Sequence, residues 1–503
     1  MKKVNKIFAV AMTLLMLLVT DVKAATTITV DTAKKGTVDT NSYYVTNTST
    51  LTVSNVGTTD TFKAYKILDV YYNQTTNEIT YEFTSAFKAF LAATSTYSSL
   101  TVEQYYALTN GDIASGSTKT TSTLDKLASA YAAYIKNNSV TGYDMTVEGT
   151  NATLTAEAGT YLVLPTLTNR VYAVMVGNLA FAATGTEWNL NTATIIAKVS
   201  DAGVSKSVGQ EGYAEGSFVI GKEFTYSLTA TVPVYPTNAT NKKYTLTDTF
   251  STGITFSGLS SITVKSGTET FTTAANGTIT NATGDTVATA TFANQVLTID
   301  FNLDYIDTTR IDITYKGSLN ENAVLGSAGN VNSVKLTYSN DPYGVGTYET
   351  EPTDSEATAY TYGLEVYVYG VDDNVDLSGA VFEIYSDVAL ENKIGTVTTN
   401  EQGVTTFTGL ATGTYYLKQI TAPTGYSLIR DAIEVEITST GNEAEAGEGF
   451  TRKEIPNAKV GILPATGGFG TIIFTLIGLL VLAGSISIIM VYRAKQNQEN
   501  FQV

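Results

Sequence analysis

Alternation of apolar and polar residues is the strongest pattern in the chain, and it dominates from about residue 196 onward. Phe224, Tyr226 and Leu228 lie on one face of a period of two, with threonine and serine between them. The same alternation returns over 297–303, 311–315 and much of 361–460. Half-buried strands of this kind, rich in Thr, Val and Tyr and separated by Gly and Asn turns, predict β-sandwich domains.

Residues 25–195 carry a mixed pattern, in which two helical stretches interrupt predicted strands. Apolar residues recur at helical spacing in two sets: Phe83, Phe87, Phe90 and Leu91, then Leu124, Leu127, Tyr131, Tyr134 and Ile135. Ser122 or Thr123 would cap the second helix. The first domain is therefore predicted to be β-rich with helical insertions, and the whole chain to be mainly β.

The N-terminus has the layout of a secretory signal peptide. Three lysines precede an apolar run over 7–19, and small residues follow up to Ala24 and Ala25. We expect cleavage after Ala24, because the apolar run is too short to span a bilayer comfortably. Residues 1–24 are thus predicted to be removed on secretion.

A second uncharged apolar run, 469–492, is long enough to cross a membrane, and Arg493 and Lys495 begin a basic tail after it. A pentapeptide stands just before this run: Leu463, Pro464, Ala465, Thr466 and Gly467. In this order, the three features resemble the cell-wall sorting signal of Gram-positive surface proteins, which sortase transpeptidases read. The resemblance implies cleavage between Thr466 and Gly467 and transfer of the Thr466 carbonyl to an amine. A plain single-pass membrane protein is the alternative.

Composition excludes most catalytic chemistry. The 503 residues suggest about three domains and include no cysteine and no histidine. A nucleophile activated by imidazole, an ordinary zinc site and disulfides are therefore excluded. The formal charge of −17 argues against nucleic acid as a partner. We predict no cofactor and the following division: signal peptide 1–24, domains 25–195, 196–360 and 361–460, and sorting signal 461–503.

Three polar residues intrude on the apolar faces of the middle domain. Lys206, Asp248 and Asn332 each stand in register with apolar neighbours two residues away, so their side chains should point inward. They could form a buried hydrogen-bonded network. Burial would also favour a neutral amine and a protonated acid, and attack of the amine on the Asn332 amide with loss of ammonia would leave an isopeptide bond. The residues alone leave both interpretations open.

Further motifs give the chain a family resemblance. The segment 319–324 (LNENAV), Asn332 and the segment 338–342 (YSNDP) resemble the second domain of Gram-positive, sortase-assembled backbone pilins with collagen-binding-adhesin-like (Cna-B) domains. The resemblance implies tandem immunoglobulin-like β-sandwiches. It also implies an isopeptide bond between Lys206 and Asn332, with Asp248 as the catalytic acid.

The family carries a pilin motif, a tryptophan followed within about ten residues by a Val-Tyr-Pro-Lys-like segment whose lysine accepts the next subunit. Trp188 and Lys198 are the best match, although Ile196 and Ala197 replace the tyrosine and the proline. The resemblance therefore implies a linkage from Thr466 of one subunit to Lys198 of another. Lys206 is the competing acceptor, but its inward register argues against access by an enzyme.

The predicted third domain resembles the smaller Cna-B sandwich over 377–385 and 415–426, with departures. Gln419 takes the place of the glutamate in the family's E-box, and 364–376 contains no lysine where the family has its nucleophile. Asn457 still stands at the acceptor position. Since glutamine cannot transfer a proton as a carboxylic acid does, we expect no cross-link in this domain, unless Lys393 or Lys418 supplies the amine.

Two smaller questions concern metal and the first domain. Asp372, Asn374, Asp376 and Glu383 have the spacing of a calcium loop, but Leu377 stands where glycine is needed, so we predict a polar turn and no metal. Whether the first domain has its own cross-link is undecided. Its candidates are Lys63, Lys66 and Asn178, and they have no clear acid partner beyond Glu157.

The resemblance implies a major structural subunit of a covalent surface pilus, attached to the cell wall and not an enzyme. Its expected partners are a pilin-type sortase, a housekeeping sortase, identical subunits, minor pilins and peptidoglycan, and exposed tyrosines could contact a host surface ligand. The alternatives are a monomeric wall-anchored adhesin or a minor tip or base pilin. An enzyme displayed on the wall comes third.

Overall fold

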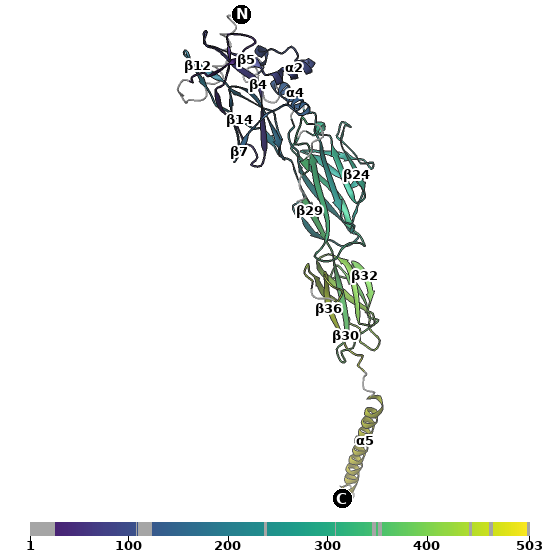
Figure 1. The fold of residues 1–503 in the computed structure, drawn as a ribbon. Coiled ribbons are helices and arrows are strands. Elements are labelled where there is room, and N and C mark those ends of the chain that lie inside the picture. Colours follow the sequence, from purple (N-terminus) through teal and green to yellow (C-terminus); the bar gives the residue numbers. More distant parts are fainter. Residues whose placement is uncertain are drawn as a thin grey trace. The chain divides into compact units, whose positions relative to one another are not determined.

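The computed structural model describes residues 26–106, 108, 123–235, 239–306, 308–344, 349–350, 355–441, 445–461 and 466–499. The described chain forms two compact units, one built from residues up to 324 and 328–360, the other from 325–327 and 361 onward. Strands dominate both units (Figure 1). The predicted signal peptide lies outside the described residues.

The first part of unit 1 contains a seven-stranded sheet and a four-stranded sheet. The larger sheet has the order β1-β2-β4-β9-β11, with β5 and β6 also paired to β4, and the smaller has the order β14-β3-β8-β7. Their bounds are β1 Val30–Lys35, β2 Tyr43–Val45, β3 Thr48–Ser54, β4 Thr61–Asn73, β5 Glu78–Phe83, β6 Tyr143–Asp144, β7 Thr146–Glu148, β8 Asn151–Glu157, β9 Gly159–Leu167, β11 Met175–Leu179 and β14 Ala193–Ile196. Two short pairs complete this part: β10 Val171–Tyr172 with β15 Val199–Ser200, and β12 Phe181–Thr184 with β13 Glu187–Leu190.

The two predicted helices are present beside the larger sheet, as α2 Ser85–Ala93 and α4 Thr123–Asn138 (Figure 1). The Thr84 side chain accepts a hydrogen bond from the Phe87 backbone and caps α2. Phe87, Phe90 and Leu91 turn the buried face of α2 toward Tyr131 of α4. The prediction placed Phe83 on the helix, but it ends β5, because the helix begins only after the Thr84 cap.

The second part of unit 1 is a fourteen-stranded array whose main path runs β16-β18-β26-β21-β22-β23-β24-β25-β19-β27-β29-β17. Its bounds are β16 Gly203–Val208, β17 Glu215–Ser217, β18 Glu223–Thr231, β19 Tyr244–Phe250, β20 Ile254–Phe256, β21 Thr263–Ser266, β22 Glu269–Thr273, β23 Thr278–Thr280, β24 Thr286–Ala293, β25 Val296–Phe301, β26 Arg310–Leu319, β27 Asn330–Tyr338, β28 Glu349–Thr350 and β29 Ser355–Tyr360. Buried residues alternate with partly exposed ones in β18, so the period of two predicts the buried face of this strand correctly.

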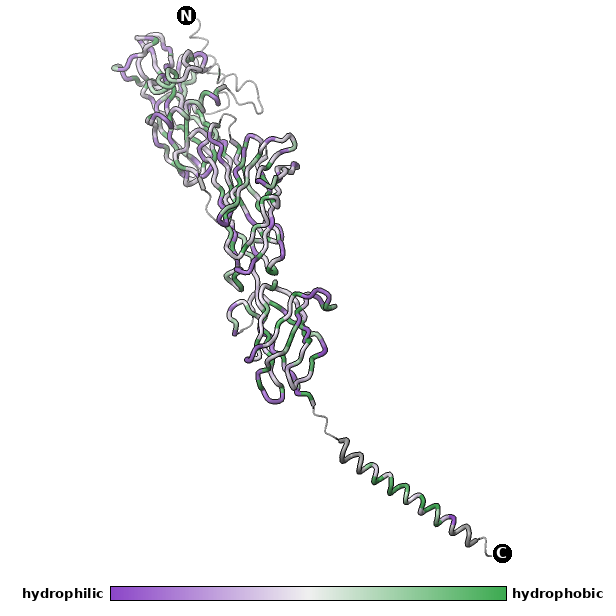
Figure 2. The backbone as a smooth tube through the Cα atoms, turned by 90° about the vertical axis from the view of Figure 1, so that its right-hand side faces the viewer, coloured by the Kyte–Doolittle hydropathy of each residue, from purple (hydrophilic) through white to green (hydrophobic). Residues whose placement is uncertain are grey.

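Unit 2 contains a three-stranded sheet in the order β33-β30-β36 and a four-stranded sheet in the order β32-β31-β34-β35. The bounds are β30 Tyr362–Gly370, β31 Val381–Tyr385, β32 Lys393–Thr398, β33 Val404–Leu410, β34 Gly413–Thr421, β35 Ile433–Ile437 and β36 Phe450–Asn457. The first and last strands, β30 and β36, are parallel neighbours. The last described element is helix α5, Thr466–Glu499, which is mostly apolar (Figure 2). The mainly β fold with N-terminal helical segments is confirmed.

Candidate functional site

The middle part of unit 1 brings Lys206, Asp248 and Asn332 together from three strands, β16, β19 and β27. The Lys206 ammonium nitrogen lies 2.6 Å from both carboxylate oxygens of Asp248. Asn332 stands opposite Phe250, two residues beyond Asp248 on the neighbouring strand. All three side chains point inward, as their register predicts, and all three residues are buried.

Tyr315 of β26 is the fourth member of this site, and sequence reasoning missed it. Its hydroxyl accepts hydrogen bonds from Lys206 at 2.6 Å and from the Asn332 side-chain amide at 2.9 Å, and it donates one to Asp248. The hydroxyl therefore connects the amine, the acid and the amide. Its inward register with Ile311 and Ile313 was visible in the sequence and could have identified it.

Burial shapes the electrostatics of this site. Desolvation lowers the pKa of Lys206 to about 8, although the neighbouring Asp248 opposes the shift. Desolvation also raises the pKa of Asp248 above its ordinary value, against the effect of Lys206. Aromatic rings line the amine, with the Tyr226 ring centroid 5.0 Å from the Lys206 nitrogen. Both shifts favour the neutral forms, which are the forms that acylation of an amine requires.

Asn332 is not satisfied as a structural amide. Its side-chain oxygen is buried and has no hydrogen-bond partner among the described residues. Buried polar atoms in native proteins are nearly always paired, and an exception needs an explanation. An unpaired carbonyl oxygen, on an amide that shares the Tyr315 hydroxyl with a carboxyl group and an amine, weakens the interpretation as a purely structural network.

The corresponding site in unit 2 contains two amides and, within the described ranges, no amine. Gln419 of β34 and Asn457 of β36 are buried and exchange two hydrogen bonds of 3.3 Å. Asn457 also donates to the Ser427 backbone at 2.8 Å, and Gln419 accepts from the Ile429 backbone at 2.9 Å. The two side chains are therefore paired and neutral.

The two lysines that could replace the missing nucleophile are engaged elsewhere. Lys393 forms an ion pair with Glu383 at 3.0 Å, and half of its side chain is exposed. Lys418 donates to the Arg430 backbone carbonyl. Among the described residues of unit 2, no lysine is hydrogen-bonded to Asn457, so the geometry favours the absence of a cross-link here.

An ion pair joins the two strands of unit 2 that such a cross-link would connect. Glu365 of β30 and Arg452 of β36 are direct register partners, and their charged groups lie 2.8 Å apart. The Glu365 side chain is 1% exposed and also accepts backbone hydrogen bonds from Glu445 and Ala446. The Arg452 guanidinium lies 4.6 Å from the Tyr367 ring centroid. We call this pair the β30–β36 latch.

The candidates in the first domain do not form one site. Lys66 is buried and contacts Tyr44 at 2.8 Å, Asp69 at 3.2 Å and Glu157 at 3.4 Å. Lys63 instead pairs with Asp144, and Asn178 accepts from the Thr160 hydroxyl. Lys66 and Glu157 are thus brought together, but among the described residues Asn178 forms no hydrogen bond with either. The Lys66 cluster has the contacts of a buried ion-pair network.

Lys198 lies in the short segment between β14 and β15 and is exposed. Among the described residues, its ammonium group has no hydrogen bond or ion pair, in contrast to Lys206, whose side chain is fully shielded. A pocket of about 430 Å³ lies beside it, lined mainly by apolar residues, among them Val171, Val174, Ile196, Val234 and Tyr343. Trp188 does not contact this segment; it packs against another core and donates to Asn77.

The sorting signal is only partly described. Leu463, Pro464 and Ala465 lie outside the described residues, and Thr466 and Gly467 begin α5. Within α5, Phe474–Arg493 has a mean hydropathy of 2.5 and is long enough to cross a membrane. This range overlaps the predicted span of 469–492.

Family models match three parts of the chain. They are the Gram-positive pilin backbone subunit 2, Cna-B-like domain, over residues 220–342, the prealbumin-like fold domain over 364–448, and the LPXTG cell wall anchor motif over 455–499. The chain belongs to the Gram-positive backbone pilins. Pilins of this family are structural subunits, and the anchor motif places this pilin at the cell wall, as the sequence predicts.

Known relatives agree with this membership. The trypsin-resistant surface T6 protein of Streptococcus pyogenes serotype M6 is 26% identical over 364 residues, which cover 55% of this pilin and 65% of the relative. Among solved structures, the T6 backbone pilin of that organism aligns with a TM-score of 0.63 at 20% identity, over 82% of this chain and 99% of its own. The full-length major pilin SpaD of Corynebacterium diphtheriae aligns with a TM-score of 0.54 at 16% identity. The alignment covers 82% of this chain and 98% of the SpaD chain. At these identities the solved structures support the fold alone.

The paired amides of unit 2 predict that Asn457 takes part in no cross-link. Asn457→Ala should therefore change the intact mass of the secreted pilin only by the mass of the substitution itself. Amide formation costs one ammonia, and in the described part of the chain no side-chain amine is hydrogen-bonded to Asn457. Intact-mass spectrometry checks this, with tryptic mapping of β30 and β36 as a second measurement. A cross-linked peptide containing Asn457 would contradict it.

The β30–β36 latch predicts that Glu365→Gln destabilises unit 2 by about 2–3 kcal/mol. This is somewhat less than the roughly 3–5 kcal/mol of a fully buried pair, because Arg452 retains contact with water. Differential scanning calorimetry of the secreted region measures it. Glu383→Gln is the matched control, since its partner Lys393 is half exposed and their solvent-screened pair should contribute much less than the buried latch. Equal losses in both variants would count against the latch.

Proposed function

We propose that this pilin is the major shaft subunit of a covalently polymerised surface pilus, with Thr466 of one subunit joined to Lys198 of the next. The contrast between two lysines carries the proposal. Lys198 is exposed, unpaired among the described residues and beside a pocket, whereas Lys206 is sealed in the core. A sortase can present its acyl group only to an amine that it can reach. The proposal keeps the predicted domains 25–195, 196–360 and 361–460.

The expected enzymes follow from this chemistry. A pilin-type sortase would cleave between Thr466 and Gly467 and transfer the threonine to Lys198, and a housekeeping sortase would transfer the last subunit to peptidoglycan. The apolar pocket beside Lys198 offers room for the apolar residues that precede the threonine. Minor pilins and a host surface ligand remain partners that the proposal allows without specifying them.

A second element of the proposal is an isopeptide bond between Lys206 and Asn332, formed without an enzyme. The neutral Lys206 nitrogen attacks the side-chain carbonyl carbon of Asn332, so that one C–N bond forms and another breaks. Protonated Asp248 polarises the amide, and protons pass from the amine through Asp248 to the departing ammonia. Tyr315 holds amine, acid and amide together through its three hydrogen bonds.

The position of the two proposed bonds defines the path of a tensile load. Force entering at the side chain of Lys198 reaches β16 within a few residues, crosses the Lys206–Asn332 amide and continues from β27 toward Thr466. Residues 207–331 are bypassed, because the amide closes them into a loop. Residues 26–197 precede the entry point and carry no load. Unit 2 lies on the path and depends on the β30–β36 latch.

The linkage predicts that Lys198→Ala abolishes the high-molecular-mass ladder of wall extracts on a denaturing gel. The amine is the acceptor, and the subunit should then appear only as monomer attached to the wall. Lys222→Ala is the control, because Lys222 is also exposed in the same unit. A ladder that survives Lys198→Ala would favour another acceptor, and no ladder in the parent protein would favour a monomeric adhesin or a minor pilin.

The internal bond predicts that the secreted pilin is lighter than its sequence by one ammonia, and that Asn332→Ala and Asp248→Ala remove this deficit. Asn330→Ala is the matched control, since Asn330 is buried on the same strand but bonds to backbone groups of Val324 and Ala359. Loss of the bond should lower the free energy of unfolding by about 4–5 kcal/mol, because the amide closes a loop of roughly 100 residues or more. A deficit that persists in Asn332→Ala would place the bond elsewhere.

A further inference from the structure

The backbone at Lys198 is held on both sides of its α-carbon. The carbonyl before it, that of Ala197, accepts a hydrogen bond from the Asn55 side chain at 3.0 Å. The carbonyl of Lys198 itself accepts from the Ala173 backbone at 3.0 Å. These two bonds fix the peptide planes on either side of the residue and thereby the direction in which its side chain leaves the chain.

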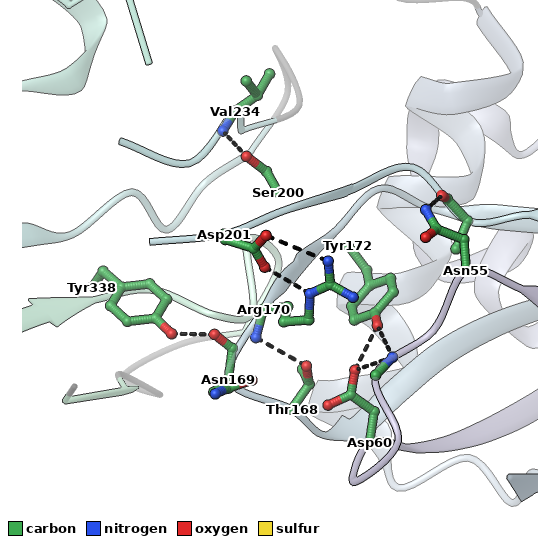
Figure 3. Close-up of polar contacts among 12 residues, drawn as sticks. Asn55, Asp60, Thr168, Asn169, Arg170, Tyr172, Ser200, Asp201, Val234 and Tyr338 are labelled. Carbon is green, nitrogen blue, oxygen red and sulfur yellow. Dashed lines mark hydrogen bonds and ion pairs between the residues drawn. The ribbon is translucent and has the colours of Figure 1, made fainter. Parts of the chain in front are cut away.

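Asn55 belongs to a turn that continues from the end of β3, residues 54–60, which we call the 54–60 turn. Besides the Asn55 bond, the turn accepts the Ala197 N–H at the Ser54 carbonyl, at 2.9 Å, and the Ser54 hydroxyl donates to the Ile195 carbonyl at 3.3 Å. Three hydrogen bonds therefore join the segment that leads to Lys198 to the residue pair Ser54 and Asn55. Figure 3 shows Asn55 and the residues that support the turn.

The 54–60 turn is itself closed by a buried acid and a buried tyrosine. Asp60 is 3% exposed and accepts from the Gly57 backbone at 3.1 Å and from the Tyr172 hydroxyl at 2.5 Å (Figure 3). Burial and the bond to Asp60 raise the pKa of Tyr172 to about 12, so its hydroxyl stays protonated and able to donate. Tyr172 is also the register partner of Val199, the residue after Lys198. The 54–60 turn is thus linked to the residues on both sides of Lys198. Asn55 bonds to Ala197, and Tyr172, which bonds to Asp60, pairs with Val199.

Asn55 has a backbone φ of 65°, a conformation that asparagine tolerates better than most residues. That conformation closes the turn and places the side-chain amide on the Ala197 carbonyl. A residue that could not adopt this φ would shift the turn, and with it the side-chain position that now contacts the Ala197 carbonyl, even if the fold persisted. The conformation and the bond explain why asparagine suits this position.

The hydrogen bonds also account for the departure of this chain from the pilin motif. A proline before the lysine would fix φ near −65° without a backbone donor. Ala197 lacks that restraint, but its N–H can donate, and the Ser54 carbonyl accepts it. Restraint by the 54–60 turn thus replaces restraint by a proline ring.

We propose that Asn55, supported by the Asp60–Tyr172 pair, is a positioning residue that orients Lys198 for acylation. The inference rests on the proposed linkage at Lys198. Asn55 does not touch the reacting nitrogen and acts through the Ala197 carbonyl. Preorganisation of this kind raises the rate of transfer, because the sortase acyl group meets an amine that already has the required direction.

The test compares Asn55→Gly with Asn77→Gly in the full secreted pilin. Both asparagines have positive φ, 65° and 54°, so glycine preserves either backbone and removes only the amide. Asn77 contacts Trp188 and Tyr72 and lies in another part of the domain. With the pilin-type sortase of the host and a peptide donor bearing the LPATG sequence, we expect kcat/KM for transfer to fall about tenfold in Asn55→Gly and less than twofold in Asn77→Gly.

A second readout separates orientation from general damage. Acylation of Lys198 by a small N-hydroxysuccinimide ester, followed by peptide mass spectrometry, should be equally fast in both variants, because a small reagent needs an exposed amine but not a directed one. Unchanged enzymatic transfer in Asn55→Gly would overturn the inference, and so would equal losses in the two variants. If Lys198→Ala leaves transfer intact, the proposed linkage falls and the inference falls with it. If Lys198→Ala abolishes transfer and Asn55→Gly does not slow it, only the inference fails.

Discussion

The exclusion of water from one lysine amine governs the middle of this pilin. Lys206 is fully shielded, and the groups within hydrogen-bond distance of its nitrogen are the Asp248 carboxyl and the Tyr315 hydroxyl. A charged ammonium ion in such a place loses its hydration, which is why its pKa falls, and the same desolvation raises the pKa of the acid. Burial therefore supplies a nucleophile and an acid together, with no imidazole or thiol in the chain.

Lys198 illustrates the opposite solution to the same chemical problem. Its side chain is exposed, and in the proposed linkage an external enzyme activates the amine. What the fold can supply is a fixed orientation of the backbone that carries the Lys198 side chain. The bonds from Asn55 and Ala173 restrain the backbone while leaving the side chain unpaired among the described residues. In the proposed assembly, one lysine is activated by burial for an internal bond, and the other is held in position for an external one.

Sequence reasoning recovered the inward set because side chains alternate strictly along a strand. We could identify Lys206, Asp248 and Asn332 because each lies two residues from apolar neighbours on its strand, so that its side chain points to the same buried face. Tyr315 obeys the same count but was overlooked, because a tyrosine among apolar residues looks like ordinary core. The latch could not be predicted in this way. Glu365 and Arg452 lie 87 positions apart, and only the parallel pairing of β30 with β36 makes them neighbours. The same holds for Asn55, whose bond to Ala197 spans 142 positions.

The proposed point at which tensile load enters, Lys198, accounts for the different links between strands in the three domains. If neighbouring subunits pull on Lys198 and Thr466, everything before Lys198 is unloaded, so a network such as that of Lys66 suffices in the first domain. In that case the middle domain bears the load, and the proposed amide would join its first strand to β27. Unit 2 bears the same load, yet its buried amides are paired with each other, and its first and last strands are joined by an ion pair. A noncovalent latch can open and close again, whereas an amide cannot. With the two proposed bonds in place, unit 2 would therefore be the segment on the load path that can extend under force and recover, while the middle domain would keep its length.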